Sequence, residues 1–588
     1  MGAMFSTLRM VLQTFRTLIN DYEVVSKRLS VSPGIPRLNS SVPYWTVPPS
    51  SIAQHGKDAE LPEHTDIVII GSGITGTSIA KALLEHTGGA SNHAKPLNIV
   101  MLEARDACSG ATGRNGGHAS PIIYNEYFGL KKAHGAAVAL QILQFRLAHI
   151  STLLNVAKEE DLLEESQARK VENYDAFLQP EFFAKARDEL NAFIKEVPKE
   201  VSEEFGVTDG REAIEKLQLA TSIIGLISKP GASIHPYRLV TGILSKLLSR
   251  FTNFQLYTHT PCTGITTEHG NYIVSTPKGK IQAHHVIHAT NAWSSHLLPG
   301  LRRKIVPFKA HMSTQRPGQG LHVTDSVDNI KPSSPLDWTG QRAFVFYPGN
   351  LDIAYDYLTQ FLPAPSSKTV IEPIDNSKTL PPHHAALPTA GEFMFGGGAM
   401  IGGSSEAALL GVVGVADDEH PDFAVEAYLS GALPMYFSNN WGEEGSSSDD
   451  KANNSSSGEW GKGRVKAMWT GLVGLSADAN PWVGRVPVSV SGRPGPTSPR
   501  SANPPLESKV AISETENFTL APSGEWICAG YSGEGMVHAW LCGRALVRMM
   551  LGVSGGGEDE GDPELPTPFL ITEKRIKQAR IEDFMENT

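Results

Sequence analysis

The segment Asp66–Gly76 constrains the fold of this chain more than any other. It reads Asp-Ile-Val-Ile-Ile-Gly-Ser-Gly-Ile-Thr-Gly, so a short apolar run leads directly into a Gly-x-Gly-x-x-Gly turn. A helical pattern follows, and a second apolar run over residues 97–102 ends in Glu103. This order of strand, glycine turn, helix, strand and acid is typical of a unit that binds a dinucleotide.

Each part of this unit has a physical role. Gly71 permits the tight turn, Gly73 lets backbone N–H groups approach a pyrophosphate, and Gly76 lets the helix pack closely on the strand. The N-terminus of the helix faces the phosphate charge. Glu103 is suited to bind a ribose 2′-hydroxyl, which argues against a 2′-phosphate. We call the turn that is predicted to hold the pyrophosphate the glycine cradle. It comprises Gly71, Ser72, Gly73, Ile74, Thr75 and Gly76.

A second glycine-rich loop follows Glu103 directly. It combines glycines with Ser, Thr, Asn and Arg, and small residues let a backbone touch a flat ring. Arg114 and His118 would supply hydrogen-bond donors to that ligand. The alternative is a plain surface loop. The predicted ligand contacts are Ala104, Arg105, Ser109, Gly110, Thr112, Arg114, Asn115, Gly116, Gly117 and His118.

A third signal lies near the C-terminus, over residues 527–537. An apolar run ends in a Gly-rich turn, and a helical pattern then continues to about Leu551. The positive end of such a helix favours negative charge on a bound ring. A simple tight turn between strand and helix is the alternative. The residues expected to contact the ligand are Gly533, Glu534, Gly535 and Met536.

Together these motifs resemble the D-amino-acid-oxidase-like family of FAD-dependent oxidoreductases. The resemblance covers about residues 65–550 and also includes Ala289–Trp293. The loop at 110–117 is similar to the amine-oxidising branch that contains γ-glutamylputrescine oxidase, and residues 33–45 look like uncharacterised fungal members of that branch. His118 departs from the pattern, because the bacterial amine oxidases more typically carry Gln there.

The resemblance implies an α/β fold. An FAD-binding Rossmann-type domain with a parallel sheet would be assembled from separated segments, and a substrate domain with a largely antiparallel sheet would cap the flavin. The expected order is a lead-in (1–62), FAD-binding segments (63–158, 226–300 and 469–552), a helical part of the substrate domain (159–225), the capping domain (301–468) and an acidic mobile tail (553–588). Polar insertions are expected at 364–388, 443–458 and 487–515.

The resemblance also implies the chemistry. A hydride leaves the carbon beside the nitrogen of a small amine or amino acid and reaches flavin N5, the imine hydrolyses, and O2 is reduced to H2O2. FAD is expected to bind non-covalently, with Cys262, Ala289 and Thr290 among its contacts. The candidate catalytic residues are His118, Arg114 and Tyr357, with Tyr347 and Tyr355 beside them and Lys309 as a cation that could assist O2. His118 is the group best able to titrate near neutral pH.

Two other functions remain open: an FAD dehydrogenase with another acceptor, and a flavin-binding scaffold without turnover. A nicotinamide enzyme is disfavoured, because the second and third loops exceed what such a site needs. The net charge of −11 and the lack of a basic block exclude nucleic acid as an expected partner. Four widely spaced cysteines indicate a reducing compartment, and we assign no metal ligands.

The N-terminus leaves three interpretations open. Residues 1–20 carry Arg9 and Arg16, no acid, and apolar residues at helical spacing, as in an amphipathic helix. This helix could dock on the protein or a partner, or act as a mitochondrial presequence. It could also contact a membrane surface, because Gly2 and Ser6 fit the myristoylation pattern. The expected location is cytoplasmic, with those two alternatives.

Overall fold

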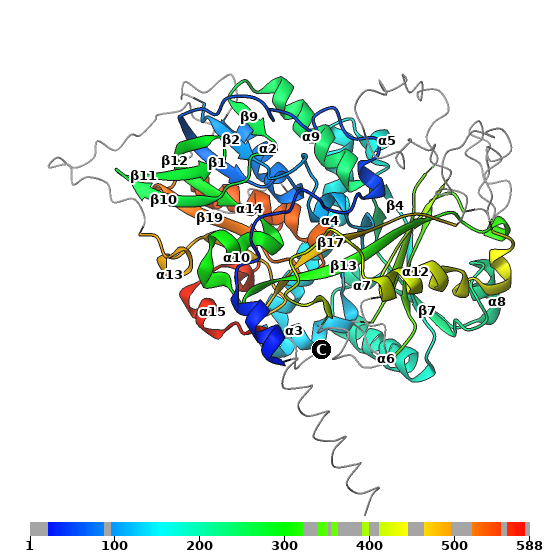
Figure 1. The fold of residues 1–588 in the computed structure, drawn as a ribbon. Coiled ribbons are helices and arrows are strands. Elements are labelled where there is room, and N and C mark those ends of the chain that lie inside the picture. Colours follow the sequence, from blue (N-terminus) through cyan, green and yellow to red (C-terminus); the bar gives the residue numbers. More distant parts are fainter. Residues whose placement is uncertain are drawn as a thin grey trace, which may run out of the picture.

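The computed structural model describes residues 22–87, 96–321, 338–350, 354–362, 391–398, 411–444, 464–494, 520–553 and 561–582. Two eight-stranded sheets organise this part of the chain (Figure 1). The predicted helix at 1–20, the predicted insertion at 364–388 and most of the other two lie outside the described residues.

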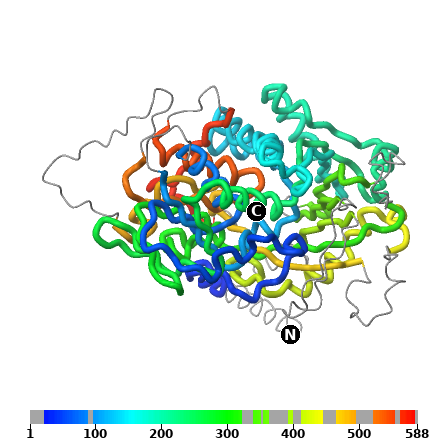
Figure 2. The backbone as a smooth tube through the Cα atoms, turned by 90° about the horizontal axis from the view of Figure 1, so that it is seen from above, coloured from blue at the N-terminus to red at the C-terminus, as the bar shows by residue number. Residues whose placement is uncertain are grey.

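The first sheet is built around the predicted glycine unit. β1 (His64–Ile70) lies between β12 (Gly279–His288) and β2 (Ile99–Leu102), and β9 (Phe254–Tyr257) follows β2; these pairs are parallel. β19 (Gly524–Ala529) pairs in parallel with the C-terminal part of β12. Segments far apart in the sequence therefore lie side by side, and Figure 2 shows the orange-red C-terminal part next to the blue β1 region. The antiparallel members are β10 (Gly264–Glu268), β11 (Asn271–Thr276) and β18 (Trp482–Arg485).

The apolar run of β1 is explained by burial on both faces. Ile67 and Ile69 pack in one core cluster with α2 (Ile74–Thr87) and α14 (Ala539–Leu551), while Val68 packs in another with β11 and β12. All three side chains are fully buried. A strand covered on both sides has no polar face, so its sequence is continuously apolar rather than alternating.

The second sheet is largely antiparallel, with a single parallel pair among its described strands, β14 with β5. α6 (Pro180–Glu196) packs on one face beside Phe177 and Val345, and α12 (Phe423–Met435) packs on the other beside Phe344 and Phe395. In sheet order its strands are β17 (Val465–Ser476), β13 (Ile305–Gln315), β16 (Phe393–Gly396), β15 (Asp356–Gln360), β14 (Arg342–Tyr347), β5 (Glu172–Phe177), β7 (Gly225–Lys229) and β6 (Gly206–Thr208). The expected fold class, a parallel Rossmann-type sheet plus an antiparallel sheet, is confirmed.

The described chain has further elements outside these two sheets. They include η1 (Tyr44–Thr46), β3 (His118–Ala119), α3 (Tyr124–His134), α4 (Ala136–Glu159), β4 (Arg169–Lys170), β8 (Ala232–Ser233), α9 (Pro236–Arg250), α13 (Val488–Ser491), η9 (Thr567–Phe569) and α15 (Glu573–Gln578). β3, β8 and β4 form a separate three-stranded sheet.

The structure corrects the expected helical part at 159–225. β5 and β6 are strands of the second sheet, and β7 and residues 469–476 of β17 also belong to that sheet rather than to FAD-binding segments. β5 escapes a sequence search because its buried face carries Asn173 and Asp175, where a strand normally shows apolar residues.

The expected mobile tail at 553–588 is also wrong over its described part. Phe569, Ile571, Ile576 and Ile581 are buried, and Val483 on β18 forms a bridge with Leu570. The predicted insertion at 487–515 likewise begins with an ordered helix, α13, in which Val490 is fully buried. The prediction of a mobile tail rested on the acidic and glycine residues upstream and overlooked the apolar residues that follow them.

We expect Arg575→Ala to lower the free energy of unfolding by about 1–3 kcal/mol. Arg575 Nε and Nη2 donate to the two oxygens of Asp478 at 2.7 and 2.8 Å, and its guanidinium lies 3.8 Å from the Trp482 ring. Urea unfolding followed by tryptophan fluorescence measures the change. Lys577→Ala is the matched control on the exposed side of α15, and equal losses in both variants would contradict a docked tail.

Within the predicted lead-in (1–62), residues 32–50 pack against several distant segments before β1 begins. The backbone N–H of Ser41 donates to the carbonyl of Asp418 at 2.8 Å, and its hydroxyl accepts from Thr470 N at 3.0 Å. The Trp45 ring packs 4.4 Å from His235 and 5.3 Å from Phe361. In Figure 1 this dark-blue segment runs across the middle of the view toward α5.

Two enclosed histidines make stability depend on pH. On α4, His149 Nε2 accepts from Leu541 N at 3.2 Å; His538 Nε2 accepts from Arg146 Nε at 3.2 Å. Burial lowers the pKa of each ring to about 3, so both stay neutral in the folded protein where an unfolded chain would protonate them.

We therefore expect the free energy of unfolding to fall as the pH drops from about 6.5 toward 3, by about 1.4 kcal/mol per pH unit for each histidine. Urea unfolding at a series of pH values measures this slope. It should shrink in His149→Gln and persist in His269→Gln, because His269 lies exposed in a turn. An identical slope in both variants would contradict this assignment.

Candidate functional site

A single cavity of about 620 Å³ joins the predicted motifs. It extends from the glycine turn between β1 and α2 to aromatic side chains of β14 and β15 in the second sheet. The predicted residues that line it are Gly71, Ser72, Gly73, Ile74, Thr75, Glu103, Ala104, Arg105, Gly110, Thr112, Arg114, Asn115, Gly116, His118, Cys262, Ala289, Thr290, Tyr357, Gly533, Glu534, Gly535 and Met536.

The geometry of the first turn requires glycine. Gly71 has φ +110°, and a Cβ there would lie 2.6 Å from the carbonyl oxygen of Ala289. A Cβ on Gly76 would lie 2.0 Å from the carbonyl oxygen of Gly71. The strand end and the helix start therefore approach more closely than any side chain allows, and this leaves the N-terminus of α2 open to the cavity.

Glu103 ends β2 at the cavity wall. Its Oε2 accepts from the Ser72 hydroxyl at 2.6 Å and the Ser72 N–H at 3.2 Å, and its Oε1 accepts from Arg105 N at 3.1 Å. The carboxylate is thus fixed beside the glycine turn, where a ribose would lie next to a pyrophosphate on the helix N-terminus. Its role in binding ribose stays a prediction.

Three predicted contacts do not line the cavity: Gly76, Ser109 and Gly117. Gly76 is used for packing. The carbonyl of Ser109 accepts hydrogen bonds from Arg105 and Arg114. Gly117 has φ +70°, and a Cβ there would lie 2.1 Å from the carbonyl oxygen of Ile234. These residues shape the loop from behind rather than touching a ligand.

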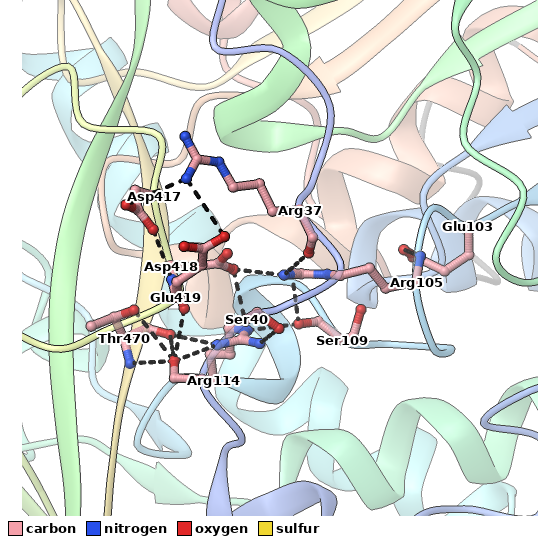
Figure 3. A network of polar contacts seen from close by, with 11 residues as sticks. Arg37, Ser40, Glu103, Arg105, Ser109, Arg114, Asp417, Asp418, Glu419 and Thr470 are labelled. Carbon is pink, nitrogen blue, oxygen red and sulfur yellow. Dashed lines mark hydrogen bonds and ion pairs between the residues drawn. The ribbon is translucent and has the colours of Figure 1, made fainter.

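Arg114 is not positioned as a catalytic donor, which corrects the sequence-based expectation. Its side chain is buried, and each of its three nitrogens donates a hydrogen bond to the protein (Figure 3). Nε donates to the Ser109 carbonyl at 2.8 Å, Nη1 to the Thr470 carbonyl at 2.7 Å, and Nη2 to the Ser40 hydroxyl at 2.7 Å. Burial, together with the charge of Arg105, lowers the pKa of Arg114 to about 9. Arg114 therefore fastens the loop to β17 and the lead-in.

The same network contains a buried ionic cluster, which Figure 3 shows in full. Asp418 Oδ2 accepts from Arg105 Nη1 at 2.8 Å and lies 3.7 Å from Arg114 Nε; all three side chains are at most 6% exposed. Arg37, by contrast, is 55% exposed and lies 3.6 Å from Asp417. One buried carboxylate thus holds two arginines of the loop that follows the ribose acid.

His118 lies at the substrate-domain end of the cavity, on β3. Its Nε2 is 2.9 Å from Asn173 Oδ1, and its ring stacks on Tyr357 with centroids 6.3 Å apart. Burial and the positive charge of Lys229 lower its pKa to about 3. The expectation that His118 switches near neutral pH is therefore wrong, because the ring is neutral throughout that range.

A buried ion pair lies beside His118, and no motif in the sequence predicted it. Lys229, at the end of β7, lines the cavity, and its Nζ lies 2.7 Å from Asp175 Oδ1. The other oxygen of Asp175 accepts from the Tyr124 hydroxyl at 2.9 Å. The only available signal was a lysine that ends an apolar run just before Pro230-Gly231. Lys309, the cation considered from sequence, does not line the cavity, although its neighbours Phe308 and Ala310 do.

Three tyrosines surround the same end: Tyr347, Tyr355 and Tyr357 all line the cavity. Burial, with the charges of Glu534 and Glu126, raises the pKa of Tyr355 to about 12, so its hydroxyl stays protonated. Glu534, from the third predicted motif, lines the cavity, but its carboxylate is held by Ile122 N at 3.1 Å and Arg146 at 3.2 Å.

The residues around this cavity fit FAD. The glycine turn leaves a cradle that a Cβ would close, Glu103 lies beside it, and small residues of two further loops line the remaining wall. A long dinucleotide would extend from α2 toward the second sheet. Cys528 and Cys542 are fully buried and do not line the cavity.

Comparisons with known proteins agree with this geometry. A family model described as FAD dependent oxidoreductase (DAO) matches residues 66–549. The probable oxidoreductase OrdL of Haemophilus influenzae is 25% identical over 287 residues, which are 45% of this chain and 59% of that protein. The chain therefore matches less than two thirds of the length of this relative.

Solved structures share the fold at low identity. L-proline dehydrogenase from P. horikoshii superposes with a TM-score of 0.52 at 17% identity, covering 89% of this chain and 100% of that chain. An L-amino acid deaminase from Proteus vulgaris gives 0.53 at 15%, covering 90% and 99%. Glycine oxidase from Geobacillus kaustophilus gives 0.51 at 14%, covering 87% and 99%. At these identities the likeness concerns the fold alone.

Proposed function

Because the chain belongs to the DAO family of FAD-dependent oxidoreductases, we propose that it oxidises the C–N bond of a small amine, with O2 as electron acceptor. FAD is the cofactor of this family. The glycine cradle, Glu103 and the loops at 110–118 and 533–536 would hold it. When bound, FAD supplies a two-electron acceptor for the hydrogen that leaves the carbon beside the nitrogen.

The observation that carries the choice of an amine over an amino acid is that the cations of the cavity wall already have partners. Among the described lining residues these are Arg105, Arg114 and Lys229. Asp418 lies within 4 Å of both arginines, and Asp175 lies within 4 Å of the lysine. A substrate carboxylate would have to displace one of these buried carboxylates, which is costly. An amine needs no such exchange.

The cavity wall also carries negatively charged side chains. Glu126 and Glu534 both line the cavity, and the two carboxylates share Arg146. Tyr355 and Tyr357 line the same cavity, and aromatic rings attract cations. These groups favour the approach of an alkylammonium, which must lose a proton before oxidation.

The non-covalent attachment of FAD is part of the proposal. It is supported by the burial of Cys528 and Cys542 outside the cavity. Acid precipitation of the purified protein should release the flavin into the supernatant, whereas flavin that stays in the pellet would contradict non-covalent binding.

The experiment that tests the function is anaerobic mixing of the purified flavoprotein with matched pairs of substrates. Each pair contains a primary or secondary alkylamine and the α-amino acid that differs only by the added carboxylate. We expect the flavin absorbance to bleach with the amine member, and O2 to restore it with formation of H2O2. Faster bleaching with the amino-acid members would overturn the choice of an amine.

Two other outcomes have distinct meanings. A flavin that is bleached by amines but reoxidised by an artificial acceptor and not by O2 would make the protein a dehydrogenase. A flavin that dithionite reduces but no substrate bleaches would contradict the proposed enzyme activity and favour a flavin-binding scaffold.

A further inference from the structure

The side chain of Asn173 has one possible orientation. It is 1% exposed, and its Nδ2 lies 3.1 Å from the carbonyl oxygen of Pro230 and 2.8 Å from the Ser120 hydroxyl. A carbonyl oxygen only accepts hydrogen bonds, so the amide nitrogen must face Pro230. Gly231 closes the space behind it, because a Cβ there would lie 2.6 Å from Asn173 Nδ2.

This orientation determines the tautomer of His118. The oxygen of Asn173 faces His118 Nε2 at 2.9 Å, and an amide oxygen only accepts, so Nε2 carries the proton. In a neutral imidazole the other nitrogen then has a free lone pair. No described residue forms a hydrogen bond with His118 Nδ1, and His118 lines the cavity.

The groups around the ring keep it in this form. Lys229 of β7 carries a positive charge close to His118, and Asp175 of β5 is engaged by Lys229 and Tyr124 rather than by the ring. Tyr357 of β15 stacks on the ring, and burial raises the pKa of its hydroxyl, which stays protonated. The imidazole therefore lies near a cation that is already paired with a carboxylate, and it stacks on a phenol.

We propose that His118 Nδ1 accepts a hydrogen bond from the N–H of the substrate amine, and that Asn173 is the positioning residue that presents this lone pair to the cavity. The inference rests on the proposed function. It assigns recognition of the nitrogen to a neutral acceptor, so primary and secondary amines are substrates, whereas tertiary amines, whose free-base nitrogen has no N–H, are disfavoured. The ring orients the amine and takes up no proton.

The first test needs no turnover. In the holoenzyme with ¹⁵N-labelled histidine, the difference spectrum against His118→Gln isolates the His118 signals. We expect an unprotonated Nδ1 and a protonated Nε2 from pH 5 to 9. A protonated Nδ1 in that range would overturn the proposal, whatever the protein's activity.

The second test uses the reductive half-reaction. His118→Gln places an amide that can still reach Asn173 but offers no acceptor at the position of Nδ1. With a secondary amine we expect the apparent affinity to fall about tenfold, as for the loss of one hydrogen bond to a buried acceptor. The corresponding tertiary amine, a poor substrate of the native protein, should lose nothing further. Equal losses for the two amines would contradict the role of Nδ1.

The third test changes the positioning residue. Asn173→Asp places a carboxylate at His118 Nε2, which favours the imidazolium and converts Nδ1 into a donor. Substrate ionisation affects both proteins alike, so we compare the variant with the native protein at each pH. We expect the ratio of their rates of flavin reduction to fall at acid pH, with a limb between pH 5 and 8. Asn173→Asp combined with His118→Gln should lack the limb. A limb that persists in the double variant would show that Asn173 acts in another way.

These outcomes separate the inference from the function on which it rests. If no amine bleaches the flavin, the proposed function fails, while the tautomer of His118 is still measured in the resting protein. If amines bleach the flavin and the tautomer is as assigned, but His118→Gln leaves the affinities unchanged, the function stands and recognition through Nδ1 is wrong.

Discussion

Replacing Asp418 by alanine is expected to lower the free energy of unfolding by about 3–5 kcal/mol, the largest loss we expect from any single side chain in this protein. The carboxylate is 2% exposed and is the only described acid within 4 Å of Arg105 and Arg114. Without it, two buried guanidinium groups have no carboxylate of the described chain within 4 Å. The loop at 105–118 would also loosen from the lead-in, so we expect FAD to be lost at lower temperature.

Asp417→Ala is the matched control for this prediction. Asp417 is the adjacent residue, its side chain is 39% exposed, and it lies 3.6 Å from a solvent-exposed Arg37. Exposed pairs of this kind contribute about 0–1 kcal/mol. Chemical unfolding and thermal release of flavin fluorescence measure both effects. Similar losses in the two variants would show that burial of the cluster is not what makes Asp418 important.

Gly76→Ala is expected to yield protein without FAD. The new Cβ would lie 2.0 Å from the carbonyl oxygen of Gly71, a backbone atom that cannot rotate away. The turn must then open, and the N-terminus of α2 loses its position against the phosphates. We expect the ratio of flavin to protein absorbance in the purified variant to fall at least tenfold, because the cradle itself is displaced.

Gly129→Ala provides the matched control. Gly129 lies within α3, no heavy atom lies within 4 Å of an added Cβ, and alanine favours a helix by about 1 kcal/mol. This variant should keep its full flavin content. Retention of flavin by Gly76→Ala would contradict the cradle that the structure shows.

The sequence predicted well what is local. The glycine turn, Glu103 and the loop at 110–118 are continuous motifs whose residue types follow from backbone constraints, and they all reach one cavity. The two apolar runs on either side of the glycine turn and its helix, β1 and β2, were also correctly predicted as strands. Hydrophobic periodicity and residue composition are sufficient to predict a strand that is covered on both faces or a turn that requires glycine.

The sequence could not reveal partners that lie far away along the chain. Arg114 looks like a free cation in the sequence, and only the fold brings Asp418 and Thr470 to it. Lys229 and Asp175 form a pair across two strands, and Asn173 on β5 decides the state of His118. The buried face of β5 carries polar residues, so the sequence did not show the pattern of a strand and this segment was predicted to be helical. Such departures are expected where function overrides the usual pattern.

The order of strands in the first sheet has a consequence for biosynthesis. β1 and β2 emerge early, but the edge of β12 that accepts β19 stays unpaired until Gly524 has been made. β12 is complete at His288, so at translation rates of about 5–20 residues per second that edge waits for roughly 10–50 s until β19 begins to emerge. An open strand edge in a growing chain is a site for mispairing, which chaperones must shield. A transcript that ends before Gly524 would therefore keep the whole glycine motif and still encode a chain whose central sheet never closes.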